Sequence, residues 1–557
     1  MSLTREVKFT GPPALVFPTL TETQMARVAA RGDVRELREG DVLIEPGDTS
    51  FSFFLIRAGE LHTVWPMPNT NAENLVSVTA PGQFTGEVNL LVGRPALFRV
   101  RVTKPGEAIE VSRPNVIALV QGDAELGEIL MRAFTLRRAG LVRSEIGDVA
   151  LVGSLHSKDT LRIREFLRRN AYPFAYLDLD RDPDVQGFME TFHFGADDVP
   201  VVICRGQAAL RNPSNQEIAS CLGFNESISL EQVRDVVIVG AGPSGLAAAV
   251  YGASEGLDVL VVETGSPGGQ AGSSSRIENY LGFPNGISGE ELAARAYAQA
   301  EKFGAQMLTA TSARLRCDRS PYVVETSDGA SISTRSIVIA TGVQYRKLDV
   351  PNLAQFEGAG IYYGATEIER SLCVDEDVVI VGGANSAGQA AVFLSQSPKK
   401  VHVLIRGDGL ASTMSRYLVR RIEETPNIVL HPHTEIVQLD GSDHLESMLW
   451  RNNQTGVTEE HGIRHVFLMT GGVPNSGWLE GCVALDSKGF VKTGPELSPE
   501  DLSAARWPLL RPPYLFESSL PRVFAVGDIR SQSVKRVASA VGEGSIAISF
   551  VHQVMRE

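Results

Sequence analysis

The chain has 557 residues, 43% of them hydrophobic and 21% charged, which is ordinary for a globular protein and too long for one hydrophobic core. Because 52 Lys and Arg face 66 Asp and Glu, the net charge is −14, which argues against nucleic acid as a main partner. No apolar run reaches the roughly 18 residues of a membrane span, and the first residues lack the apolar stretch of a signal peptide. We therefore expect a cytoplasmic protein without a membrane span.

The cysteines are few and scattered, and their spacing gives no sign of a metal centre. No two of them are placed as metal ligands or as a redox C-x-x-C pair. This pattern predicts no metal site and suits a reducing compartment. The five are Cys204, Cys221, Cys317, Cys373 and Cys482.

The N-terminal part, residues 1–143, predicts a β-roll. After a short helical pattern, residues 38–65 alternate apolar and polar side chains, with glycines at turn spacing. Short strands separated by glycine turns are typical of a β-roll or barrel. The periodicity of residues 124–143 predicts a closing helix.

Residues 146–226 predict a smaller α/β domain. An apolar strand is followed by an amphipathic helix at 158–170 and a second strand. This order implies a parallel pair of strands joined by a crossover. The polar stretch 225–232 is predicted to be a linker.

From residue 233 a strand–turn–helix unit occurs twice, at 235–254 and 377–396. In the first copy, Gly240, Gly242 and Gly245 form G-x-G-x-x-G between strand and helix. These glycines permit a tight turn, close approach of a pyrophosphate and helix–strand packing, and the helix N-terminus attracts phosphate. The next strand ends at Glu263, where a carboxylate can accept hydrogen bonds from ribose. The unit therefore predicts a dinucleotide site.

In the second copy the glycine pattern is reduced to Gly382, Ala384 and Ala387, and the following strand ends at Arg406 rather than at an acid. A cation at this place favours the 2′-phosphate of NADP(H) over the free hydroxyl of NAD(H). The alternative is that Arg406 is a solvated residue at a strand end.

Segment 232–557 contains eight short motifs in a fixed order: GAGPSG at 240–245, PGGQ at 267–270, IENYLGFP at 277–284, ISG at 287–289, ATG at 340–342, GGANSA at 382–387, VPN at 473–475 and VFAVGD at 523–528. In the order and spacing of these motifs the segment resembles the low-molecular-weight thioredoxin reductases. This resemblance implies two Rossmann-like domains, one for FAD (232–345 and 466–557) and one for NAD(P)H (346–465). It also implies a homodimer.

The resemblance implies which residues contact the cofactors. Those for FAD are Gly240, Gly242, Pro243, Ser244, Gly245, Glu263, Gly269, Gln270, Asn279, Thr341, Gly342, Gly527, Asp528, Arg536 and Val537. Those for NADPH are Gly382, Ala384, Asn385, Ser386, Ala387 and Arg406. In the last flavin-contacting stretch, residues 535–537, the first two residues differ from the family's.

The departure from this family lies where it carries C-A-T-C. Here Gly364 and Glu367 flank Ala365 and Thr366, and neither can form a disulfide. Glu367 is a candidate acid or base near the flavin, with a solvated helix residue as the alternative. Cys373 follows six residues later and is predicted to be a packed core cysteine.

The N-terminal β-roll resembles cyclic-nucleotide-binding domains. Residues 84–100 are similar to their phosphate-binding cassette, with Gly86, Glu87 and Pro95 in place. Ala96 stands where the resemblance expects the arginine that pairs with the cyclic phosphate. The β-roll is interpreted as an assembly or docking domain, or as the site of a small-molecule effector. Arg94 and Arg99 are nearby, but a charge-assisted pair depends on position, so cyclic AMP or GMP is expected to bind weakly or not at all.

Residues 146–226 resemble a thioredoxin or glutaredoxin fold, with Val199-Pro200 at the family's cis-proline site. Its C-x-x-C is replaced by Ser154-Leu155-His156-Ser157, and serine cannot perform thiol exchange. His156 is a candidate proton donor, and the alternative is a surface histidine. Cys204 and Cys221 are expected to be structural.

Together these features predict an oxidoreductase that moves hydride from NAD(P)H to FAD. Because both disulfide motifs are absent, the electrons would pass to an unidentified non-disulfide acceptor: a protein carrier, a quinone, a small oxidant or oxygen. The alternatives are an FAD-dependent oxidase of a small substrate and a non-catalytic redox or nucleotide sensor.

Overall fold

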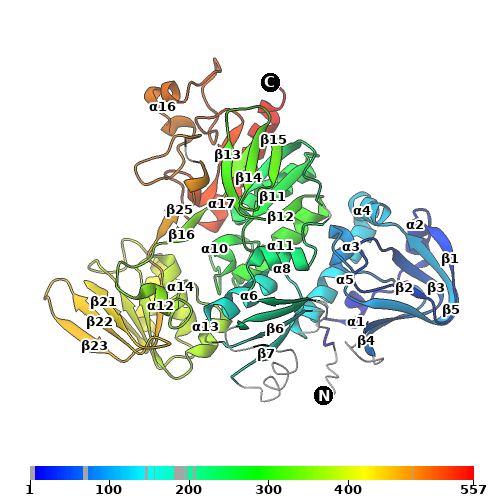
Figure 1. Ribbon diagram of the computed structural model, residues 1–557, viewed down its shortest axis with the longest axis horizontal. Coiled ribbons are helices and arrows are strands. Elements are labelled where there is room, and N and C mark those ends of the chain that lie inside the picture. The colour runs from blue at the N-terminus through cyan, green and yellow to red at the C-terminus, as the bar shows by residue number, and fades with distance from the viewer. Residues whose placement is uncertain are drawn as a thin grey trace. The chain divides into compact units, whose positions relative to one another are not determined.

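The computed structural model (Figure 1) describes residues 7–9, 11–66, 73–144, 149–155, 157–180, 194, 198–204, 208–226, 228–479 and 481–557. They fall into two compact units. One contains Met1–Leu155, Arg162–Ser229 and Ala298–Thr309, and the other contains His156–Leu161, Leu230–Tyr297 and Ala310–Glu557. Within the described ranges, no helix is both long and apolar enough to cross a membrane.

The N-terminal strands form the predicted β-roll, with β5 at the centre of an antiparallel sheet in the order β1-β5-β3-β4 and β2 also paired with β5. At Gly106 an added Cβ would lie 2.1 Å from the carbonyl oxygen of Ala58, so only glycine permits this close crossing. The predicted closing helix is confirmed as α5. The strands are β1 (Asp33–Leu37), β2 (Val42–Ile44), β3 (Phe53–Pro66), β4 (Glu73–Thr79) and β5 (Arg99–Val111). The helices are α1 (Pro13–Val16), α2 (Glu22–Ala29), α3 (Val88–Val92), α4 (Arg113–Gly122) and α5 (Ala124–Arg143).

The next part is a four-stranded sheet in the order β7-β6-β8-β9. Strands β6 and β7 are parallel, which confirms the predicted crossover, and β8 and β9 are antiparallel additions. Helix α6 buries Ile163, Phe166 and Leu167 against the sheet, because these residues share one helical face. The elements are β6 (Val149–Gly153), α6 (Lys158–Arg169), β7 (Ala175–Asp178), β8 (Val201–Cys204), β9 (Ala208–Arg211) and α8 (Asn215–Cys221).

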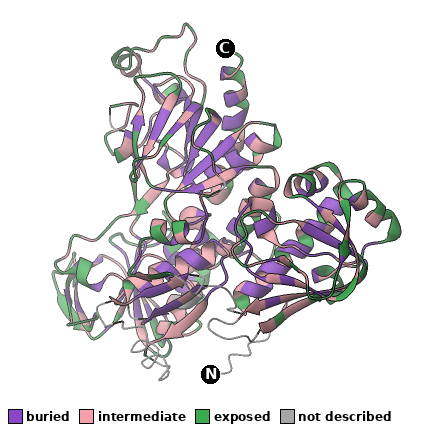
Figure 2. Ribbon diagram, turned by 45° about the vertical axis from the view of Figure 1, so that its right-hand side comes forward, coloured by how far each residue is buried: buried purple, intermediate pink, exposed green. Residues whose placement is uncertain are grey.

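The sheet that follows has seven strands in the order β12-β11-β10-β15-β14-β13, with β26 paired to β15. Its central strand β10 buries Val236, Val237 and Ile238 completely, and Figure 2 shows the strands here as largely buried. A continuous apolar run is expected where helices cover both faces of parallel strands. The strands are β10 (Arg234–Val239), β11 (Val259–Glu263), β12 (Gln306–Thr309), β13 (Ser312–Arg316), β14 (Tyr322–Thr326), β15 (Ser331–Ile339) and β26 (Val523–Ala525). The helices and 3₁₀ turns are α9 (Pro243–Ser254), α10 (Gly269–Gly272), α11 (Gly289–Lys302), η2 (Gly477–Leu479), η3 (Gly494–Glu496), α16 (Pro499–Ala504), η4 (Gly527–Ile529) and α17 (Val537–Val554).

A second parallel sheet has the order β17-β24-β18-β19-β20 and is accompanied by the antiparallel meander β21-β22-β23. The chain reaches this sheet through β16 (Val343–Tyr345) and returns through β25 (Gly472–Pro474), which pair with each other. The strands are β17 (Ile361–Tyr362), β18 (Asp377–Val381), β19 (Lys400–Leu404), β20 (Ile428–His431), β21 (Thr434–Asp440), β22 (Ser447–Asn452), β23 (Thr458–His461) and β24 (His465–Leu468). The helices are α12 (Leu353–Phe356), α13 (Glu367–Leu372), α14 (Asn385–Leu394) and α15 (Arg416–Glu424).

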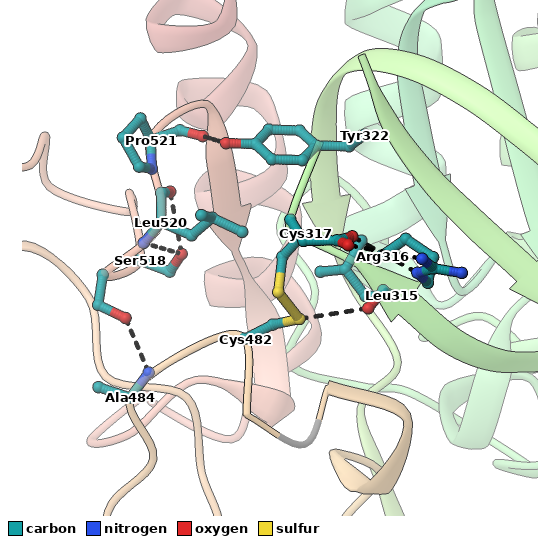
Figure 3. The surroundings of a disulfide bond; sticks show 11 residues. Leu315, Arg316, Cys317, Tyr322, Cys482, Ala484, Ser518, Leu520 and Pro521 are labelled. Atoms are coloured by element: carbon teal, nitrogen blue, oxygen red, sulfur yellow. Dashed lines mark hydrogen bonds and ion pairs between the residues drawn. A yellow bond between two sulfur atoms is a disulfide. The ribbon is translucent and has the colours of Figure 1, made fainter. Parts of the chain in front are cut away.

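One feature of the cysteines was not anticipated from their spacing. Cys317 and Cys482 form a disulfide across 165 residues of sequence, with Cα atoms 5.8 Å apart. Figure 3 shows the bond linking the end of β13 to the segment after η2. The spacing of the cysteines, which led to the expectation of a reducing compartment, could not reveal the Cys317–Cys482 pair.

Candidate functional site

The first glycine turn has the geometry of a phosphate cradle. Gly240 has a φ of +105°, and a Cβ there would lie 2.4 Å from the carbonyl oxygen of Ala340. At Gly245 a Cβ would lie 1.9 Å from the carbonyl oxygen of Gly240. Gly242, which caps α9, has no atom within 4 Å of its Cβ position. Two glycines are therefore required by packing, and the third leaves open space over a helix N-terminus, where a pyrophosphate fits.

A carboxylate lies beside this turn. Glu263 ends β11, and its oxygens accept hydrogen bonds from the backbone N–H of Ala241 (2.7 Å) and of Gly265 (2.9 Å). This side chain therefore holds the turn in shape, at the end of the strand that follows the glycine turn.

The PGGQ and ATG segments meet at the turn. The backbone N–H of Gly268 donates to the carbonyl oxygen of Ala241 at 2.7 Å, and the Cβ position of Gly269 lies 3.1 Å from the Cα of Gly242. The Gln270 amide donates to the carbonyl oxygen of Val343 at 2.7 Å. The structure thus brings the predicted residues Gly242, Gly269 and Gln270 to one place.

The ATG residues are held by a partner from the VPN motif. The hydroxyl of Thr341 donates to the carbonyl oxygen of Asn475 at 2.9 Å, and the Asn475 amide donates back to the carbonyl oxygen of Thr341 at 2.9 Å. Gly342 accepts from the backbone N–H of Asn475 at 3.1 Å. Asn475 was not among the predicted site residues, although its motif was recognised.

The C-terminal motif reaches the same helix. A Cβ at Gly527 would lie 2.5 Å from the hydroxyl of the buried Ser244, so Gly527 packs on the start of α9. Burial raises the pKa of the neighbouring Asp528, while Lys535 opposes that shift. The Lys535 ammonium donates to the carbonyl oxygen of Asp528 at 2.5 Å. Lys535, which differs from the family's residue at this position, therefore contacts the end of the VFAVGD motif.

Three of the residues predicted to contact FAD lie at or near the protein surface. Arg536 is the exposed N-cap of α17, and Val537 is the first residue of that helix. Asn279 is exposed in the loop after Ile277, and no contact among the described residues joins it to the glycine turn. Pro243 occupies the first position of α9, where its fixed φ suits a helix start.

The second glycine turn has room for the two alanines that stand where the first turn has glycines. Gly382 has a φ of +145°, and a Cβ there would lie 2.4 Å from the carbonyl oxygen of Met469, so this glycine is required. Ala384 is exposed at the N-cap of α14, whereas Ala387 is fully buried in the core. The second turn therefore accommodates a methyl group where the first turn, at Gly245, has no room for one.

The loop after β19 is anchored to this turn. The Asn385 amide oxygen accepts from the backbone N–H of Ser415 at 2.7 Å, and the Thr413 hydroxyl donates to the carbonyl oxygen of Gly383 at 2.6 Å. Ser386 and Arg406 are both exposed, and Arg406 lies two residues beyond the end of β19.

The segment around Gly364 lies against the helix that carries Gln270. Ala365 forms an isolated parallel bridge with Ser274, and the Cβ position of Gly364 lies 3.5 Å from the Cβ of Ser273. Ser273 is the C-cap of α10. Glu367 is the first residue of α13, but its side chain lies outside the described part of the structure.

The free cysteines are placed as structural residues. Cys373 is 0% exposed, and its thiol donates to the carbonyl oxygen of Glu369 at 3.1 Å. Burial, reinforced by Glu376 and Glu369, raises its pKa. Cys204 is buried and Cys221 is half-buried. The interpretation of Cys373 and Cys204 as core residues is confirmed.

The serine stretch of the four-stranded sheet has ordinary polar contacts. The Ser154 hydroxyl donates to Asp180 at 2.6 Å, and the Ser157 hydroxyl accepts from the backbone N–H of Thr160 at 3.4 Å. The Val199–Pro200 peptide bond is cis. His156 lies outside the described residues.

Neither of the two arginines near Ala96 lines the cavity of the β-roll. Arg99 is paired with Glu45 at 2.9 Å and with Glu73 at 2.7 Å. The guanidinium of Arg94 lies over the ring of Phe224, 4.0 Å from its centroid. Both nearby arginines are therefore engaged away from the cavity, and neither stands in for the missing arginine.

Two sheets with parallel strands at their centres, each with a glycine turn at a helix N-terminus and joined by a two-stranded ribbon, define a class of oxidoreductases that bind two dinucleotides. The chain belongs to the pyridine nucleotide-disulphide oxidoreductase family, whose profile matches residues 234–544. The cyclic nucleotide-binding domain family matches residues 34–123.

Within that family the chain is similar to thioredoxin reductases. It is 31% identical over 318 residues to thioredoxin reductase of Treponema pallidum (strain Nichols), covering 57% of this chain and 96% of that protein. It is 33% identical over 324 residues to NADPH-dependent thioredoxin reductase 3 of Arabidopsis thaliana, a match that spans 57% of each protein. The crystal structure of Lactococcus lactis thioredoxin reductase (FR conformation) covers 58% of this chain and all of that one, with 26% identity and a TM-score of 0.52.

The thioredoxin reductase-like members of this family use FAD and NADPH, which confirms the predicted cofactors. The residues present fit both groups, since open space lies over the helix N-terminus at Gly242 and the second turn keeps its required glycine at Gly382.

Proposed function

We propose that this protein takes hydride from NADPH onto FAD and delivers the electrons to an acceptor that is not a disulfide. FAD, when bound, supplies the two-electron carrier between nicotinamide and acceptor. One observation carries the proposal: the segment beside α10, at the positions of the family's cysteine pair, presents Gly364, Ala365 and Thr366 and no sulfur.

The remaining sulfur atoms support this proposal by their positions. Cys373 is buried and its pKa is raised, so it is a poor nucleophile at neutral pH. The disulfide lies at the other end of the sheet, because Arg316 pairs with Val323 and Tyr322 pairs with Thr334, which in turn lies opposite Arg234 at the start of β10.

The glycine turn follows the opposite end of β10, at Gly240. Six residues at roughly 3.3 Å along β10 and three steps of about 4.8 Å across the sheet put the disulfide about 25 Å from the turn. This distance prevents direct exchange of electrons between the disulfide and a group bound at the turn's phosphate cradle.

The proposal assigns FAD to the cradle formed by Gly240, Gly242 and Gly245, with Glu263 at the ribose and Asp528 farther along the same cofactor. The further FAD contacts are assigned to Pro243, Ser244, Gly269, Gln270, Asn279, Thr341, Gly342, Gly527, Arg536 and Val537. NADPH is assigned to Gly382, Ala384, Asn385, Ser386, Ala387 and Arg406. Glu367 is assigned as an acid or base beside the acceptor.

Arg406 is proposed to select NADPH over NADH. Its exposed guanidinium stands after β19, where it can pair with a 2′-phosphate. A hydrogen bond to a charged group contributes about 1.5–3 kcal/mol, so Arg406→Gln should reduce the preference for NADPH by roughly tenfold or more. Arg416→Gln on α15 is the matched control, and equal loss in both variants would contradict the assignment.

The domain limits follow the same proposal: a β-roll at 1–143, a thioredoxin-like domain at 146–226, an FAD domain at 232–345 and 466–557, and an NADPH domain at 346–465. The thioredoxin-like assignment is supported by the strand order β7-β6-β8-β9 and the parallel pairing of β6 with β7. We further propose a homodimer, which light scattering would reveal as twice the chain mass of 60.1 kDa.

The test is anaerobic reduction of the flavin by NADPH, followed by steady-state turnover with a quinone, ferricyanide, thioredoxin or a chromogenic disulfide. Flavin reduction and quinone or ferricyanide turnover should persist when all five cysteines are serine. Thioredoxin and the chromogenic disulfide should give no turnover above the uncatalysed rate.

A gain-of-function variant sharpens this test. Gly364 has room for a side chain, since its Cβ position is in ordinary contact distance of Ser273. Restoring the pair with Gly364→Cys and Glu367→Cys should create NADPH-dependent disulfide reduction that the single variants lack. Robust thioredoxin turnover by the parent protein would overturn the proposal.

A further inference from the structure

The β-roll encloses a cavity of about 70 Å³, here called the β-roll cavity. Its wall is mostly apolar, with the rings of Phe17, Phe51 and Phe98 and the side chain of Leu97, and its charged lining residues are Glu87 and Arg137. Small-molecule sites in proteins have this character, an apolar wall with a few placed polar groups.

The wall is unsuited to a cyclic phosphate. Ala96 lines the cavity, and its backbone N–H already donates to the carbonyl oxygen of Asp48 at 2.9 Å. The guanidinium expected at this position is absent, and the cavity's cation comes instead from helix α5, at Arg137.

Arg137 is buried, with 6% of its surface exposed. Its Nε donates to the carbonyl oxygen of Val16 at 3.0 Å, and its Nη1 donates to that of Gly86 at 2.8 Å. The guanidinium lies 4.9 Å from the ring centroids of both Phe17 and Phe84. Its buried Nη2 has no hydrogen-bond partner among the described residues, although a buried N–H of a charged group is costly when left unpaired.

The charges around the cavity do not balance. The buried Arg138 contacts the half-buried Glu87 carboxylate at 2.7 Å, so these two charges offset each other. Arg137 then contributes one further positive charge, and burial lowers its pKa to about 9, with only Glu87 acting in the opposite direction. An uncompensated buried cation is unfavourable, and an anion in the cavity would compensate it.

We propose that the β-roll cavity binds a small apolar monocarboxylate, rather than a cyclic nucleotide. The carboxylate accepts a hydrogen bond from Nη2 of Arg137, and the hydrocarbon part packs against Phe17, Phe51 and Phe98. Arg137 thereby gains its missing partner, and the apolar wall is covered by an apolar ligand.

The experiment uses the full chain and ¹⁹F NMR with 4-fluorobenzoate and 4-fluorophenylacetate as probes. At least one acid should bind, and at least tenfold more tightly than its neutral amide, because only the carboxylate pairs with the guanidinium. Hexanoate should displace it and cyclic AMP should not. Failure of both acids to bind, equal binding of acid and amide, or displacement by cyclic AMP would each overturn the proposal.

Two variants test whether the acid binds in the β-roll cavity. Arg137→Met should weaken binding at least tenfold, whereas Arg132→Met on the exposed face of the same helix should not change it. Because Arg137 also holds two backbone carbonyl groups, its variant can fail to fold, and Ala96→Leu provides the second test by filling the cavity. Binding that survives Ala96→Leu unchanged would show that the acid binds elsewhere and would refute the proposal.

Discussion

The backbone contacts of Glu263 and its proposed contact with ribose give the sharpest prediction about the proposed flavin site. Its carboxylate accepts from Ala241 at 2.7 Å and from Gly265 at 2.9 Å, so Glu263→Gln removes the charge and places an amide NH₂ against one of these backbone N–H groups. Hydrogen bonds to a charged group contribute about 1.5–3 kcal/mol each. Loss of one such bond should weaken FAD binding by roughly 10- to 150-fold.

The assay is titration of apoprotein with FAD, followed by flavin fluorescence, together with the ratio of flavin to protein after gel filtration. Glu255→Gln is the matched control, because Glu255 follows α9 on the same strand–helix–strand unit and pairs with His552 at its surface. An FAD affinity of the Glu263→Gln protein within twofold of both parent and control would refute the reasoning.

Three further predictions concern buried groups and the cross-link. Cys373→Ser should leave NADPH–quinone turnover within about twofold of the parent, because the thiol is buried against Glu369 and a merely packed cysteine takes no part in transfer; a tenfold loss would show a redox role. Burial and the neighbouring imidazoles lower the pKa of His431 to about 4, below its unfolded value of about 6.5, so its neutral form stabilises the fold above pH 6.5 and this contribution is lost as the pH falls through 4. The Tm should accordingly fall less between pH 7 and pH 4 in His431→Asn than in the parent, and identical pH profiles would contradict the assignment. Replacing Cys317 and Cys482 by serine opens a loop of 165 residues, for which the chain-entropy argument gives at most about 5 kcal/mol; the urea midpoint for loss of bound flavin should fall, and an unchanged midpoint would show that the link does not stabilise this part of the fold.

Local patterns predicted the elements well where one short stretch determines them. The glycine turn at Gly240 and Gly245 was predictable because backbone crowding at these two positions excludes any side chain. The closing helix α5 was predictable from its periodicity, and the parallel pair β6–β7 from the order of strand and helix. For α5, for the β6–β7 pair and for Gly245 the controlling interactions lie within one strand–helix–strand unit or less, whereas Gly240 is crowded by the carbonyl oxygen of Ala340.

The features that sequence reasoning missed depend on packing between distant segments. Arg94 and Arg99 are near Ala96 in the sequence, but the packed fold directs one to Phe224 and the other to Glu45 and Glu73. The cation at the cavity is instead Arg137, which helix α5 supplies from about 40 residues farther along the chain. The pairing of Cys317 with Cys482 likewise has no local signal, because spacing rules describe only neighbouring cysteines.

The short ribbon of β16 and β25 determines where one segment of this protein can be exchanged for another. Tyr345 lies opposite Gly472 in the ribbon, so the outgoing and returning chains run side by side where they leave the first sheet. Domain insertions are tolerated where both ends of the inserted segment emerge together. The segment between Tyr345 and Gly472 is therefore a natural cassette, one that recombination could exchange for another nucleotide-binding segment while the host sheet and its glycine turn keep their connections.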